Sequence, residues 1–112
     1  MKLSKVAELL DAKVLSKKFD GDTEVYAAWS CDLMSDVLAF VEDQALLITG
    51  LINPQVVRTA AMMDMKAIVF VRGKQPGEDI IELADECEIS ILSTEKPMYV
   101  SSGILYSEGL RK

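Results

Sequence analysis

The sequence predicts an α/β fold: a single layered domain with a mostly parallel sheet of about five strands and helices on both faces. The first observation is that short apolar runs alternate with capped amphipathic segments between residues 44 and 94. The second is that helix-start signals follow two of these runs, at Asn53-Pro54 and Pro76-Gly77. Strict alternation of strands and helices implies parallel pairing. The length of 112 residues suits one core, so we expect residues 1–112 to form one domain.

The first part of the chain predicts a short helix and two strands. Apolar residues at helical spacing predict a helix over residues 5–10, with Ser4 as its cap. A first strand is expected within 12–17. After the turn signal of residues 20–22, residues 23–29 predict a second strand. Its alternation places Val25, Ala27 and Trp29 on one face.

A helix is predicted next, over residues 33–41, with Asp32 or Ser35 as its cap. Its inward-facing residues are expected to be Val37, Leu38 and Val41. Glu42 and Asp43 are expected to end it.

The remainder predicts a regular alternation. The expected elements are strands over 45–49, 67–71 and 88–94, and helices over 54–63, 78–87 and from about 97 onward, the last carrying Val100, Ile104 and Leu105. Asn53 suits the N-cap and Pro54 the first helical position, where a missing N–H is harmless. Asp64 stands where a residue in left-handed geometry ends that helix. The unbroken apolar run 67–71 is typical of a strand buried on both faces.

Composition excludes several classes of protein. The chain carries 18 acidic and 12 basic residues, a net charge of −6, and its longest basic cluster is Lys17-Lys18. A nucleic-acid partner is therefore not expected, because phosphate neutralisation needs a basic face. No signal-peptide pattern and no apolar stretch of membrane-spanning length is present, so we expect a cytoplasmic protein without membrane contact.

The usual catalytic and metal-binding motifs are also missing. The chain has no histidine, which removes the commonest general base and, with only Cys31 and Cys87, an ordinary Cys/His zinc site. Gly73-Lys74 does not complete a phosphate-binding loop, because Ile68 and Gln75 stand where glycine and serine or threonine are required. We expect no metal, no cofactor and no enzymatic activity. Paired carboxylates, namely Glu78-Asp79, Asp85-Glu86 and Asp43, are expected on solvated positions.

Polar residues follow three successive strands and are expected to lie side by side. Hydroxyls, backbone N–H groups and one guanidinium suit a phosphate or carboxylate, and the following helix N-termini add positive dipole ends. The predicted ligand-binding residues are Thr49, Gly50, Arg72, Gly73, Ser93, Thr94 and Glu95.

Apolar segments recur in a specific order between residues 4 and 110. They are Leu9-Leu10-x-Ala12-x-Val14-Leu15, Val25 leading to Leu33-Met34-Ser35-x-x-Leu38, Leu46-Leu47-Ile48-Thr49-Gly50, Lys66-Ala67-Ile68-Val69, Ile80-Ile81-Glu82-Leu83-Ala84 and Ile89-x-Ile91-Leu92-Ser93-Thr94. This order resembles the DRTGG domain family, whose small α/β modules are similar to the N-terminal domain of HPr kinase/phosphorylase. The chain departs from the family motif: Leu51-Ile52-Asn53 replaces the Asp-Arg pair, and the Thr-Gly-Gly region reads Val71-Arg72-Gly73.

The resemblance implies regulation and association rather than catalysis. Our leading hypothesis is a non-enzymatic regulatory module that self-associates as a homodimer and binds a small anionic ligand, a nucleotide or phosphate, at the strand ends. The alternative is a protein–protein adaptor of a redox or signalling complex, possibly hydrogenase-related, with its surface around Met62, Met63 and Met65. A third hypothesis, an enzyme, needs a carboxylate such as Glu95 desolvated in the crevice.

Overall fold

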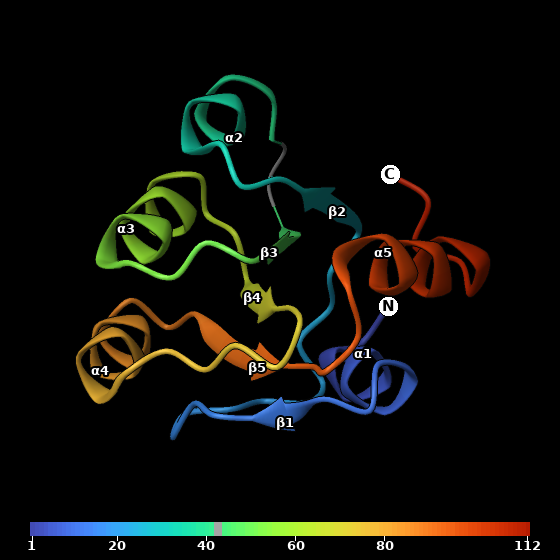
Figure 1. The fold of residues 1–112 in the computed structure, drawn as a ribbon, viewed down its shortest axis with the longest axis horizontal. Helices are drawn as coiled ribbons and strands as arrows, with labels where there is room; N and C mark the ends of the chain where they lie inside the picture. The colour runs from blue at the N-terminus through green and yellow to red at the C-terminus, as the bar shows by residue number, and fades with distance from the viewer. Residues whose placement is uncertain (42–43) are drawn as a thin grey trace.

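The computed structural model describes residues 1–41 and 44–112, in which five helices surround a five-stranded sheet (Figure 1). The elements in chain order are α1 (Leu3–Leu9), β1 (Lys13–Val14), β2 (Ala27–Ser30), α2 (Met34–Phe40), β3 (Ala45–Thr49), α3 (Pro54–Met62), β4 (Ala67–Phe70), α4 (Glu78–Glu86), β5 (Ser90–Ser93) and α5 (Met98–Ser107). The predicted α/β class is confirmed.

The strand order is β1-β5-β4-β3-β2, and the sheet is mixed rather than mostly parallel. The strands β2 to β5 pair in parallel, whereas β1 pairs antiparallel with β5, with Lys13 opposite Ser93. The expectation of a mostly parallel sheet is corrected at β1, which is also shorter than the predicted 12–17. A long loop without a helix joins β1 to β2. No helical crossover therefore carries the chain from the end of β1 back to the edge of the sheet at which a parallel strand would begin.

Helices cover both faces of the sheet, as predicted. Chain order and spatial order agree from β2 to β5, so right-handed crossovers place α2, α3 and α4 on one face. The helices α1 and α5 cover the other face (Figure 1). Each face has its own apolar core, one including Leu47 and Phe70 and the other Leu46 and Val69.

Several predictions for the first part of the chain are wrong in detail. The helix α1 begins after Lys2 without a side-chain cap, so Ser4 does not cap it. The second strand begins at Ala27 rather than at residue 23, and Val25 packs in the opposite core from Ala27 and Trp29. A single alternation could not predict this, because Val25 lies before β2 in irregular backbone, where the two-residue period of a strand does not hold.

The helix α2 also differs from its prediction. Its N-cap is Leu33, without a side-chain hydrogen bond, so neither Asp32 nor Ser35 caps it. Val37 and Val41 are buried as predicted, but Leu38 is exposed. The predicted helix-ending residues 42 and 43, including the carboxylate of Asp43, lie outside the described residues.

The start of α3 is confirmed. The Asn53 side chain accepts a hydrogen bond from the backbone N–H of Val56 at 3.2 Å, and Pro54 occupies the first helical turn. The amphipathic prediction for α4 also holds, since Ile80 and Ala84 are buried against the core.

Four helices end in the same way. The residues Asp11, Asp64, Glu88 and Gly109 each follow a helix and have positive φ, at 48°, 53°, 59° and 117°. After each, the next N–H bonds back to a carbonyl of the last turn, as in Met65 to Ala60 at 2.9 Å and Ile89 to Ala84 at 2.8 Å. The prediction for Asp64 is confirmed, and Glu88 holds the same conformation with a larger side chain.

Glu88→Gly is expected to raise the free energy of unfolding by about 0.5–1 kcal/mol, because glycine adopts left-handed geometry without the Cβ clash. Glu82→Gly, at an exposed interior position of the same helix, should instead lower it by a similar amount. Urea denaturation of both variants measures the difference. Equal destabilisation by the two substitutions would contradict the assignment.

Candidate functional site

The C-terminal ends of β3, β4 and β5 lie level with one another. Thr49 is opposite Phe70, and Phe70 is opposite Ser93, so the loops that follow these strands start side by side. Backbone bonds link them further, from Val71 N to Thr49 O at 3.1 Å and from Gly73 N to Thr94 O at 2.8 Å. The predicted juxtaposition of the three strand ends is therefore confirmed as geometry.

The chain leaves β4 and β5 toward opposite faces of the sheet, to α4 and to α5 respectively (Figure 1). Such a divergence opens the crevice in which open α/β sheets bind ligands. Here the crevice is bridged: Arg72 N donates to Lys96 O at 3.0 Å, and the Glu95 carboxylate lies directly over Gly73. A Cβ on Gly73 would stand 2.5 Å from Glu95 Oε2.

A tight turn over residues 71–74 carries two cationic side chains, Arg72 and Lys74, which lie toward Gly50 and away from this bridge. Lys74 N donates to Val71 O at 3.3 Å, and Arg72 and Gly73 have φ values of 59° and 70°. Two consecutive positive φ values characterise a type I′ turn, whose central positions favour glycine and asparagine. Arginine at the first of these positions is a strained choice, a feature that is frequent at functional sites.

Both cations converge on Gly50. The Lys74 ammonium donates to Gly50 O at 2.8 Å. The Arg72 guanidinium crosses the α-carbon of Gly50 so closely that a Cβ there would be 2.5 Å from Nη2. The guanidinium could not keep this position over any residue that has a side chain.

Asp32 completes the cluster, and sequence reasoning missed it by assigning it to a helix cap. Its Oδ1 accepts hydrogen bonds from the Thr49 hydroxyl and from Gly50 N, both at 2.8 Å. The Gly50 N–H first, then the Thr49 hydroxyl and the charges of Arg72 and Lys74, hold the pKa of Asp32 below its ordinary value, against an opposing contribution from desolvation. The sequence feature that could have identified Asp32 as part of the cluster is its position just after the end of β2, the strand that pairs with β3.

The lowered pKa of Asp32 predicts acid sensitivity. A carboxylate with a depressed folded-state pKa stabilises the fold fully above its ordinary value of 3.8, and this stability is lost as pH falls through the folded-state pKa. Asp32→Asn should therefore be less stable than the parent at pH 7, with the difference narrowing below about pH 4. Thermal unfolding at a series of pH values tests this, and a pH-independent difference would contradict it.

The predicted hydroxyls make internal hydrogen bonds. The buried Thr94 hydroxyl donates to Leu10 O at 2.7 Å, and that of Ser93 to Lys74 O at 2.8 Å. The Thr49 hydroxyl donates to the Asp32 carboxylate, as described above. The exposed charged groups of the cluster are Asp32, Arg72, Lys74 and Glu95. We therefore assign the hydroxyls to shaping the loops, and a ligand-binding role for the predicted residues stays a prediction.

The other sites considered from sequence fare differently. Asp85 is buried, contrary to expectation, and its carboxylate accepts hydrogen bonds from the backbone N–H groups of Lys17 and Lys18. Glu95 is exposed, so it lacks the desolvation that the enzymatic hypothesis requires. Of the methionine cluster, Met62 is exposed, whereas Met65 is buried and Met63 packs against the core.

Two classes of feature are not found in the part of the chain that the structure describes. Residues 1–41 and 44–112 contain no cluster of three or more potential metal ligands. None of the helices described is long and apolar enough to cross a bilayer.

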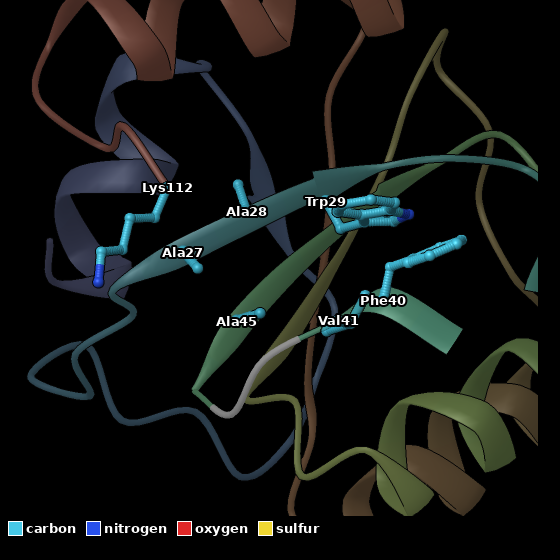
Figure 2. A pocket seen from close by; sticks show the side chains of 7 residues that line it. All are labelled: Ala27, Ala28, Trp29, Phe40, Val41, Ala45 and Lys112. Carbon is cyan, nitrogen blue, oxygen red and sulfur yellow. The ribbon is translucent and has the colours of Figure 1, made fainter. Parts of the chain in front are cut away.

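A second hollow lies beside the edge strand β2 (Figure 2). Its volume is about 260 Å³, and it is lined by Ala27, Ala28, Trp29, Phe40, Val41, Ala45 and Lys112. The rings of Trp29 and Phe40 stack with centroids 6.1 Å apart and planes at 25°. Alanines form much of its wall, which makes it an apolar recess unlike the charged cluster at Gly50.

Comparison with known proteins gives one family and a shared fold. Residues 5–106 match the family model of the DRTGG domain. Among solved structures, the fold is similar to the CBS and DRTGG domains of the regulatory region of Clostridium perfringens pyrophosphatase, complexed with its activator, diadenosine tetraphosphate. The TM-score is 0.73 at 16% identity, and the match covers 93% of this chain and 45% of that chain. No curated protein matches the sequence significantly.

Proposed function

Because this chain belongs to the DRTGG domain family, we propose that it is a non-enzymatic regulatory module that binds a small anionic ligand, a nucleotide or phosphate, at its strand ends. The observation that carries the proposal is the convergence of Arg72 and Lys74 on Gly50, with Arg72 held at positive φ. The strain of that conformation is otherwise unexplained, since glycine or asparagine would make the same turn more easily.

The chemistry of the cluster suits a phosphoryl group. A guanidinium presents paired N–H donors that match two phosphate oxygens, and an ammonium adds a second positive charge. The exposed cations Arg72 and Lys74 lie beside the exposed carboxylates of Asp32 and Glu95, so a phosphoryl group would compete with these carboxylates for the two cations. The carboxylate of Asp32 already accepts from Gly50 N, which is the interaction that an anion makes with such a loop.

The structural neighbour supports a regulatory role. That protein is the regulatory region of a pyrophosphatase bound to a nucleotide activator. The fold of this chain matches about 45% of the length of that protein chain. We propose that the ligand of this chain is also a nucleotide, and that the chain self-associates as a homodimer in the cytoplasm. The likeness to the N-terminal domain of HPr kinase/phosphorylase remains a prediction of the sequence pattern.

A thermal-shift screen of the purified chain against nucleotides, inorganic phosphates and small carboxylates tests the proposal. A ligand at 100 times its dissociation constant should stabilise the fold by about 2.7 kcal/mol, or several degrees. The expected result is stabilisation by at least one phosphate compound. The absence of any shift from every phosphate compound would contradict the ligand proposal.

The recess beside Trp29 favours a second candidate function, the protein–protein adaptor. Phe40, which lines the recess, is 64% exposed, and Leu33 at the start of the same helix is 57% exposed, so a partner that covers the recess and α2 could bury both aromatic and aliphatic surface. We therefore propose the adaptor surface at the recess instead of at the methionines expected from the sequence, because Met65 is buried and Met63 packs against the core. Phe40→Glu should then abolish capture of a redox or signalling partner, while Met62→Glu should not. Unaltered capture by Phe40→Glu would contradict it.

A further inference from the structure

A third hollow lies where β4 and β5 begin, at the edge of the sheet opposite Gly50. Its volume is about 470 Å³, within the range of roughly 300–1,000 Å³ that is usual for small-ligand sites. Five residues of the segment 17–23 line it, together with Lys66, Glu88 and Ser90. Lys66 directly precedes β4, and Ser90 is the first residue of β5. Because three of its lining residues are lysines, we call it the lysine hollow.

The segment that lines this hollow is held in place by its backbone. The buried Asp85 carboxylate accepts hydrogen bonds from the backbone N–H groups of Lys17 and Lys18, at 3.3 and 3.2 Å. At the other end of the segment, Thr23 O accepts from Leu3 N at 2.9 Å. The segment is therefore ordered before any ligand binds, which lowers the entropic cost of forming a site around one.

Ser90 brings an unpaired hydroxyl to the lysine hollow. The residue is only 6% exposed, and its backbone N–H donates to Lys66 O at 3.1 Å. Its hydroxyl makes no hydrogen bond with residues 1–41 or 44–112. In that part of the chain, the side-chain polar atoms that lack both a partner and contact with solvent belong to Trp29, Thr59 and Ser101. The Ser90 hydroxyl is not among them, so it is open to the hollow that Ser90 lines. Buried polar groups normally have partners, and a ligand in the hollow would supply one.

Charges of both signs line the lysine hollow without pairing with one another. Lys17 forms an ion pair with Glu78 of α4 at 3.2 Å, which uses its charge. The other charged residues of the hollow are Lys18, Lys66, Asp20 and Glu88. None of these four forms an ion pair with residues 1–41 or 44–112. Two ammonium groups and two carboxylates are thus set apart around one hollow. This balance suits a ligand that carries both signs of charge, and it gives a polyanion such as pyrophosphate no net attraction.

We propose that the lysine hollow binds a zwitterion of the free α-amino acid class. The ammonium groups of Lys18 and Lys66 hold the carboxylate of the ligand. The carboxylates of Asp20 and Glu88 hold its ammonium group. The Ser90 hydroxyl donates to one oxygen of the ligand carboxylate and so gains the partner that it lacks in the chain itself. This site is separate from the strand-end cluster and takes a ligand of different charge.

Amide NMR titrations of the full chain with each of the proteinogenic L-amino acids in turn test the proposal. At least one of them should give saturable shifts of the Ser90 amide and of amides in the segment 17–23. Succinate, which carries only negative charge, and 1,4-diaminobutane, which carries only positive charge, are the matched controls and should give no saturable shift at these amides. An equal response to succinate, or no saturable shift with any amino acid, would overturn the proposal.

Substitutions assign the two halves of the ligand. Lys66→Met and Glu88→Gln, which each remove one charge and keep most of the side chain, should both raise the dissociation constant of the bound amino acid about tenfold. Ser90→Ala should raise it by a factor of about 2 to 10 and keep the fold, because the hydroxyl has no partner within the described chain. Lys13→Met, the same change near the far end of β5, should leave it unaltered.

The pattern across these variants separates a zwitterion site from a simple anion site. Loss of affinity in Lys66→Met but not in Glu88→Gln would overturn the zwitterion, because only the carboxylate of the ligand would then be recognised. Pyrophosphate should not shift the Ser90 amide. Failure of the lysine hollow would therefore leave the proposed ligand at Gly50 standing, and failure of the pyrophosphate titration would leave the lysine hollow standing.

Discussion

Phe70→Ala is expected to lower the free energy of unfolding by about 3–5 kcal/mol, a large part of the stability of a domain of this size. Phe70 is the largest of the fully buried side chains, at the end of β4 in the core beneath the crossover helices. Its removal loses apolar burial and leaves a cavity that surrounding β-strands fill poorly. Chemical denaturation monitored by circular dichroism measures the loss.

The matched control is Phe40→Ala, which deletes the same atoms from a side chain that is 64% exposed. It loses mainly the stacking on Trp29, so the expected cost is about 0.5–1.5 kcal/mol. Equal effects of the two substitutions would contradict the assignment of Phe70 to the core.

Arg72→Gly is expected to weaken phosphate binding by about 10- to 100-fold without loss of stability. A hydrogen bond to a charged group contributes about 1.5–3 kcal/mol, which sets the size of the binding effect. Glycine relieves the positive φ of 59° at this position, so the melting temperature should stay constant or rise. Titration calorimetry with inorganic pyrophosphate, together with thermal unfolding, measures the two effects separately.

Lys66→Ala provides the control for net charge. Lys66 precedes β4 at the opposite end of the strand, so its loss removes one positive charge far from Gly50. Its affinity for pyrophosphate should match the parent within a factor of about two, because charges separated by more than about 10 Å are screened at 0.1 M salt. A similar loss of affinity in both variants would indicate a non-specific charge effect.

The regular part of the fold could be predicted because its signals are local. The apolar runs that became β3, β4 and β5 and the Asn53-Pro54 helix start depend on residues close in sequence. The antiparallel β1 could not be predicted in direction, because alternation is the same for either orientation of a strand. Leu38 was misplaced for a related reason, since the helical spacing of Val37, Leu38 and Val41 does not decide which of two adjacent residues faces inward.

The candidate site was predictable in place but not in detail. Strand-end residues must gather at one edge of a parallel sheet, and Thr49, Arg72 and Ser93 do so. Whether a hydroxyl faces a ligand or the protein depends on distant partners: Thr94 bonds to Leu10, 84 residues away. Asp32 was missed because aspartate before a helix is usually a cap, and its bonds to Thr49 and Gly50 exist only once β2 and β3 are paired.

The measurement that tests the central claim most directly is an amide NMR titration of the full chain with inorganic pyrophosphate and with diadenosine tetraphosphate. The account predicts saturable chemical-shift changes centred on Gly50 and on Arg72 to Lys74, which in Arg72→Gly need about 10- to 100-fold more ligand to saturate. Changes centred on another part of the molecule, or no saturable change with either compound, would contradict it.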